Sequence, residues 1–306
     1  MEIGVIISEY GKTFDDILDE ARRTAGAGLG SFWLGQHSSW HALTALTLAA
    51  RDIPGLNIGT AVIPTYPEHP LALASQALTV QAATGNRLTL GIGLSHKFII
   101  EGQYGYSFDH PVRHMRDYLH ALNALLAGRE IDYTGETLRA AGLIAIPGAR
   151  APAVLVAALG PAMLRLAGGF SDGTLAIWAG PRTIAQHLVP ILSDAAAAAG
   201  RPSPRIAVSV MVGIADSFAA AQDRFRSEYP SAGQAPSYRS MIEREGADGP
   251  QDLIAGGPAS QVRDRLEELI AAGATDLIAS VIGTLDEKEQ ALTLLAEIAS
   301  EHTGQN

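Results

Sequence analysis

Histidines and aromatic residues gather in two short stretches of this sequence. GQHSSWH (35–41) holds His37 and Trp40, and LTLGIGLSHK (88–97) contains His96. Histidine suits proton transfer because its ordinary pKa lies near neutrality. The alternative for each residue alone is a loop histidine that only makes a hydrogen bond. We take His37 and His96 as the catalytic candidates.

The glycines of LTLGIGLSHK raise a second possibility, a dinucleotide-binding loop. Such a loop has a third glycine, follows the first strand of its unit and opens a helix. Here His96 stands in the third glycine's place, the strand is the fourth, and we expect no helix directly after it. We therefore predict that the two glycines let a strand end lie close to a ligand.

The segment ALGPAM (158–163) is a candidate phosphate site. Gly160 ends a buried run and Pro161 suits the first position of a helix, where free N–H groups and the helix dipole favour an anion. An ordinary turn between a strand and a helix also favours Gly-Pro, so both interpretations stand.

Other kinds of site have little support. His110 and His114 are four residues apart, but without an HExxH motif or a third ligand we expect no metal site. The absence of cysteine and of a GxSxG motif excludes thiolate catalysis and makes an α/β-hydrolase implausible. The long loop after the fourth strand carries Tyr104, Tyr106 and His110, which we expect to shape a substrate pocket.

The elements that position these residues alternate between apolar strands and helices. We predict eight strands, at 2–8, 31–35, 56–63, 87–93, 153–159, 174–178, 206–214 and 274–282. Strands that are apolar on both faces belong to a parallel sheet covered by helices, and eight such repeats indicate a (β/α)₈ barrel. The alternative is an open, doubly wound sheet in two lobes.

In such a barrel the active site lies at the carboxyl ends of the strands, where the candidate residues fall. We expect one domain over residues 1–306, with a hairpin insertion at 129–148 and an irregular insertion at 229–257.

The amino-acid composition indicates which classes of binding partner the protein can have. A formal net charge of −10 argues against nucleic acid and anionic membranes as partners. The first residues lack the pattern of a secretory signal, and no apolar run reaches the roughly 18–20 residues that a membrane span needs. We expect a cytoplasmic protein that acts on a small molecule.

Four segments together resemble the bacterial-luciferase-like flavin and deazaflavin oxidoreductases, most closely the branch that depends on coenzyme F420. They are LNIGTAVIPTYPEHPLALASQALTVQAATGNRLTLGIGLSH (56–96), VLVAALGPAMLRLAGGFSDGTLAIWAGP (154–181), AAAAGRPSPRIAVSVMV (197–212) and PSYRSMIEREG (236–246). The resemblance implies a (β/α)₈ barrel whose mouth holds the cofactor ring against a bulge after the third strand. That bulge often contains a non-prolyl cis peptide, which maps to Ala61-Val62.

The resemblance also assigns residues to ligands. The cofactor positions are Gln36, Ala61, Val62, Gly93, Ser95, Ala157, Ala158, Leu159, Gly160, Ile177 and Trp178, with the phosphate on the amides of 158–160. On the substrate side we expect Trp40, Tyr104, Tyr106 and His110. Deazaflavin-dependent sugar-phosphate dehydrogenases carry an aspartate and a catalytic glutamate where this chain has Gln36 and His96, which argues against that substrate.

The function that we predict is hydride transfer between C5 of coenzyme F420, an 8-hydroxy-5-deazaflavin, and a small organic substrate. One alternative is an FMN-dependent two-component monooxygenase of the same fold. Another is a non-catalytic barrel that binds a cofactor or metabolite. Relatives are commonly dimers, so we expect a homodimer.

Overall fold

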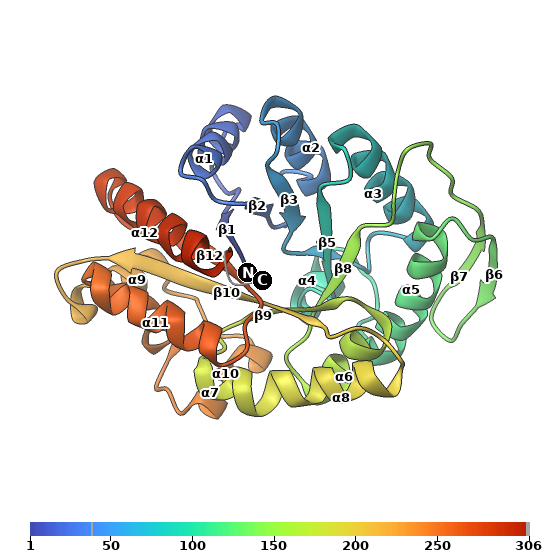
Figure 1. Ribbon diagram of the computed structural model, residues 1–306. Helices are drawn as coiled ribbons and strands as arrows, with labels where there is room; N and C mark the ends of the chain where they lie inside the picture. Colours follow the sequence, from blue (N-terminus) through green and yellow to red (C-terminus); the bar gives the residue numbers. More distant parts are fainter. Residues whose placement is uncertain (38, 304–306) are drawn as a thin grey trace.

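The computed structural model describes residues 1–37 and 39–303, and its centre is a closed barrel of parallel strands (Figure 1). The wall consists of β1 (Glu2–Ile7), β2 (Ser31–Leu34), β3 (Asn57–Thr60), β5 (Leu88–Gly93), β8 (Ala153–Ala157), β9 (Gly173–Ile177), β10 (Arg205–Ile214) and β12 (Asp276–Val281). The predicted (β/α)₈ barrel is confirmed. Pairing of β9 with β10 and of β12 with β1 closes the ring.

Helices follow the strands of this wall along the chain. They are α1 (Phe14–Gly26), α2 (Ala42–Asp52), α3 (Pro70–Thr84), α4 (Lys97–Gly102), α5 (Pro111–Leu126), α6 (Pro161–Phe170), α7 (Pro181–Thr183), α8 (Val189–Ala198), α9 (Phe218–Glu228), α10 (Pro236–Glu245), α11 (Ala259–Ala271) and α12 (Leu285–Thr303). None of the helices in the described ranges is both long and apolar enough to span a membrane.

Local signals in the sequence explain several boundaries. Thr13 and Asp16 form a capping box at the start of α1, and Pro111 begins α5. The hairpin forms as β6 (Ile131–Thr134) and β7 (Arg139–Gly142). The buried carboxylate of Asp117 anchors it by accepting hydrogen bonds from Thr137 N at 2.9 Å and Tyr133 Oη at 3.0 Å.

Four details differ from the sequence prediction. The short helix α4 begins at Lys97, so a helix does follow the fourth strand of the wall almost at once. The predicted third strand breaks at Ala61-Val62, and its continuation is β4 (Ile63–Pro64). A π-helical turn that no sequence pattern indicates, Ile184–Leu188, lies between α7 and α8. A short strand, β11 (Ala255–Gly257), adds to β10. Such short or irregular elements carry too few residues for a periodic signal.

Inside the barrel, Trp33 packs with Leu155, Leu175, Ala207 and Ile278. Its indole is accommodated by glycine, because a Cβ at Gly59 would lie 2.2 Å from Trp33 Cε3. The interior is thus a packed core, and any ligand site lies above it, at the carboxyl ends of the strands.

Candidate functional site

Two of the strand ends bring a carboxylate and an imidazole together. Glu9 follows β1 and is fully buried, and His37 follows β2 with about half of its side chain exposed. His37 Nδ1 donates to Glu9 Oε1 at 2.7 Å, whereas Glu9 Oε2 has no partner among the described residues. A carboxylate on Nδ1 fixes the ring orientation and leaves Nε2 available at the mouth.

The second candidate histidine lies nearby. His96 precedes α4, and its Nε2 is 3.5 Å from the hydroxyl of Tyr238 on α10. Burial lowers the pKa of His96, and the charge on His37 lowers that pKa further. His96 is therefore a neutral imidazole at pH 7, beside the Glu9–His37 pair.

The bulge after β3 has the expected backbone. The Ala61-Val62 peptide is cis, as the resemblance implied. Gln36 N donates to Val62 O at 3.3 Å, and the Gln36 side chain accepts from Ala42 N at the start of α2. The bulge and the end of β2 are thus joined.

The two glycines of LTLGIG serve close packing. A Cβ on Gly91 would lie 1.9 Å from Thr60 O, and one on Gly93 would lie 2.7 Å from Val62 Cγ2 and 3.1 Å from Ala157 Cβ. Gly93 therefore brings β5 against two of the residues that the resemblance assigns to the cofactor. Neither glycine has a positive φ, so the requirement is space alone.

The start of α6 is open to an acceptor. Gly160 precedes the helix, no side chain caps it, and a Cβ on Gly160 would meet nothing within 4 Å. His187, in the π-helical turn, donates to Leu159 O at 2.8 Å and holds this turn in place. Free N–H groups at the start of a ten-residue helix suit a phosphate.

The start of α7 differs, because a carboxylate already occupies it. Glu245 of α10 accepts from Arg182 N at 3.2 Å and from Thr183 N at 2.8 Å. Just before it, Trp178 is buried and its indole Nε1 has no partner among the described residues. A buried donor without a partner costs free energy, which a ligand acceptor would recover. The residues present thus fit a phosphate-bearing flavin or deazaflavin.

Several residues in the loops at the barrel mouth have an unusual backbone conformation, with positive φ. Of the described non-glycine residues, four have positive φ, and three of these are predicted site residues: Ser95, His110 and Trp178. Such conformations are uncommon outside glycine and gather at functional sites.

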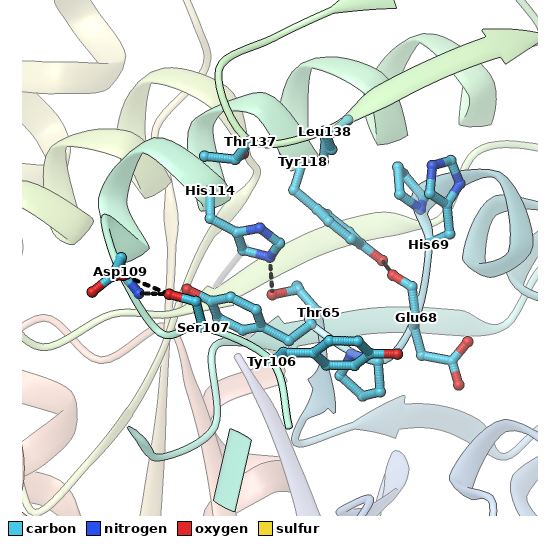
Figure 2. Close-up of a pocket in the computed structure, with 13 residues that line it drawn as sticks. Thr65, Glu68, His69, Tyr106, Ser107, Asp109, His114, Tyr118, Thr137 and Leu138 are labelled. Carbon is cyan, nitrogen blue, oxygen red and sulfur yellow. Dashed lines mark hydrogen bonds between the residues drawn. The ribbon is translucent and has the colours of Figure 1, made fainter. Parts of the chain in front are cut away.

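A cavity of about 520 Å³ opens at the rim beyond β4 (Figure 2). Tyr106 lines it, together with the Tyr66 and His114 rings, which stack 4.0 Å apart. His114 shares a hydrogen bond of 3.0 Å with Thr65 Oγ1, and burial lowers its pKa to about 4. This cavity adjoins the cofactor positions because Thr65 N donates to Gly93 O.

The other predicted substrate residues lie outside this cavity. Trp40 donates from Nε1 to Lys12 O at 3.0 Å and packs on Phe14. These contacts join the loop after β2 to the loop before α1. Tyr104 is exposed and stacks on Tyr106, and His110 is exposed before α5.

Sequence reasoning missed Glu9, Tyr238, Tyr66 and the role of His114 in the cavity. Glu9 directly follows the first strand, so the strand-end rule that found His37 also applies to it. Tyr238 lies within the segment PSYRSMIEREG that carried the resemblance. Nothing in the sequence indicates that Tyr66 and His114 stack.

Comparisons with known proteins agree with this architecture. A model of the luciferase-like monooxygenase family matches residues 1–276. An uncharacterised protein of Mycobacterium bovis is 30% identical over 216 residues, which cover 66% of this chain. The match spans only 64% of that relative's length.

Two solved structures share the fold over nearly their whole length. The coenzyme F420 dependent tetrahydromethanopterin reductase from Methanopyrus kandleri has a TM-score of 0.78 at 20% identity, covering 98% of this chain and 99% of that one. The oxygenating constituent of 3,6-diketocamphane monooxygenase from Pseudomonas putida, in complex with FMN, has a TM-score of 0.77 at 18% identity, covering 97% of each chain. At these identities the likeness shows the fold alone.

Proposed function

Because the chain belongs to the luciferase-like monooxygenase family, we propose that it is an oxidoreductase that moves a hydride between coenzyme F420 and a small organic substrate. The observation that carries the proposal is the pair of imidazoles at the barrel mouth, one held by the buried Glu9 and the other neutral. A bound deazaflavin supplies C5 as the hydride donor or acceptor.

The chain's own residues would hold the cofactor and move a proton. The backbone N–H groups at 158–160, just before the uncapped start of α6, would hold the phosphate, and Val62, Gly93 and Trp178 would line the site of the ring. His37, oriented by Glu9, gives or takes the substrate proton at Nε2. His96 and Tyr238, 3.5 Å apart, would supply neutral hydrogen-bonding groups to the substrate.

The same site is compatible with FMN, which gives the second candidate, a two-component monooxygenase. It is favoured by the fold shared with the FMN complex from Pseudomonas putida. The choice between the two cofactors comes from the F420-type segments of the sequence and from the reductase that shares the fold.

Turnover under anaerobic conditions tests the proposal. Reduced deazaflavin is mixed with a panel of enones, imines and ketones, and its reoxidation is followed by absorbance in the wild-type chain, His37→Ala and His96→Ala. We expect reoxidation with at least one compound class, and a fall in rate of about a hundredfold in each variant, the lower end of what a general acid–base group contributes. Cofactor binding should change little.

Two other results would contradict the proposal. Absence of reoxidation across the panel, with cofactor bound, would favour a non-catalytic barrel. Turnover that requires FMN and oxygen would favour the monooxygenase.

We also propose that the protein acts as a cytoplasmic homodimer. A groove of about 490 Å³ between α2 and α3 is lined by Leu43, Leu48 and Val80 among serine and threonine residues, and Leu48 is exposed. An exposed leucine in such a groove suits contact with a second copy of the chain. Light scattering should give twice the chain mass of 32.1 kDa, and Leu48→Glu should give the monomer.

A further inference from the structure

A groove crosses the barrel rim where β1 and β12 end. It has a volume of about 170 Å³ and reaches from those strand ends to side chains of α1 and α12. Of the three lysines in the chain, Lys12 and Lys288 line it, together with the hydroxyl-bearing residues Ser8, Tyr229 and Ser280.

Neither lysine forms an ion pair with a side chain of the described residues. Both are half-buried, and within the described ranges no carboxylate oxygen lies within 4.0 Å of either ammonium. The third lysine, Lys97, pairs with Glu101 at 3.7 Å. Burying part of a cation without a partner is unfavourable, so a bound anion would stabilise the pair.

The negative groups nearby do not cancel this charge. Glu20 is the one carboxylate residue on the lining of the groove. Glu287, next to Lys288 in sequence, is paired with Arg224 at 2.8 Å. Hydrogen bonds from Thr13 lower the pKa of Asp16, and the charge of Lys12 lowers that pKa further, but Asp16 is not on the lining. On the lining itself two cations face one carboxylate, which favours an anion.

The groove lies beside the catalytic candidates and away from the phosphate position. Tyr10 lines it, and the Tyr10 ring is 5.3 Å from the His37 ring. Residues 158–160 follow β8, which lies four strands round the eight-strand ring from β1, on the opposite side of the mouth. An anion in this groove is therefore separate from the cofactor phosphate.

We propose that this groove binds a carboxylate or phosphate group of the substrate, so that the substrate is an organic anion whose reacting carbon lies near His37. The assignment to a substrate rests on the proposed function. The anion site itself does not, and it is tested without turnover.

The small number of lysines allows a direct test by NMR. The full chain is labelled with ¹³Cε-lysine, which gives one signal for each lysine, assigned with Lys12→Met, Lys97→Met and Lys288→Met. Inorganic phosphate is titrated at constant ionic strength. We expect the Lys12 and Lys288 signals to shift together and saturate, while the Lys97 signal stays in place.

Variants that remove a positive or a negative charge from the groove test the anion site further. Lys288→Met should weaken phosphate binding at Lys12 by about tenfold or more, because a hydrogen bond to a charged group is lost. Glu20→Gln should strengthen binding, and Lys97→Met should leave it unchanged. Movement of all three signals without saturation, or no movement at all, would overturn the anion site.

Phosphate titration in the presence of saturating cofactor distinguishes an anionic group of the substrate from one of the cofactor. Phosphate that still shifts Lys12 and Lys288 supports a substrate group, whereas displacement of phosphate by the cofactor would assign the groove to the cofactor and overturn the proposal. If phosphate shifts neither the Lys12 nor the Lys288 signal, although the protein binds cofactor and is active, the anion site is refuted and the proposed function is not.

Discussion

Replacement of Glu9 by glutamine isolates the role of the buried carboxylate. The variant keeps the size of the side chain but removes the charge-assisted partner of His37 Nδ1, now at 2.7 Å. Such a hydrogen bond contributes about 1.5–3 kcal/mol. Since about 1.4 kcal/mol corresponds to tenfold in rate, turnover should fall about ten- to a hundredfold if the bond acts in the transition state.

Stability should behave differently from turnover. Glu9 is fully buried and Oε2 has no partner among the described residues, so the carboxylate is poorly solvated in the folded state. Neutralising it removes that cost, and we expect the free energy of unfolding to rise or to stay within about 1 kcal/mol. These two expectations together assign the carboxylate a role in the reaction at the expense of stability.

The assay combines anaerobic turnover, cofactor titration and denaturant unfolding on Glu9→Gln, with the exposed Glu289→Gln of α12 as control. We expect lower kcat, unchanged cofactor affinity and unchanged or higher stability. Wild-type turnover, or activity and stability that fall in parallel, would refute a positioning role for Glu9.

Two further predictions concern His114 and the glycines of β5. Burial lowers the pKa of His114 from an ordinary 6.5 to about 4. As the pH falls, His114 is therefore protonated in the unfolded chain before it is protonated in the folded one. Its contribution to the free energy of unfolding is fully present above about pH 6.5 and falls by up to about 3 kcal/mol as the pH drops towards 4. His114→Asn should remove that part of the pH dependence in urea unfolding, and an identical acid slope would contradict it. Gly91→Ala should destabilise the fold by about 3 kcal/mol or prevent folding, because its Cβ would meet Thr60 O. Gly160→Ala meets nothing within 4 Å and should leave the melting temperature unchanged, so equal effects of the two variants would contradict the packing argument.

The alternation of apolar strands and helices was sufficient to predict the barrel and the position of the mouth. Capping residues mark the start of α1, and Pro111 marks the start of α5. These features depend on periodicity and on local backbone chemistry, which a single sequence contains. The short elements α4, β4 and β11 depend on tertiary contacts, so the periodic signal could not predict them.

The candidate site was predicted less completely. The strand-end rule and the resemblance gave His37, His96 and the cis peptide at Ala61-Val62. The Glu9 contact, the Tyr66–His114 stack and the side-chain position of Trp40 depend on which side chains of distant segments meet. Sequence spacing does not determine such contacts.

Titration of the apo chain with coenzyme F420 and with FMN tests the central claim most directly. Binding is followed by cofactor fluorescence, with Trp178→Phe as a variant that removes the unpartnered indole N–H. We predict micromolar or tighter binding of the deazaflavin, weaker binding of FMN, and reduced deazaflavin affinity in the variant. Micromolar FMN binding without deazaflavin binding would contradict the proposed cofactor.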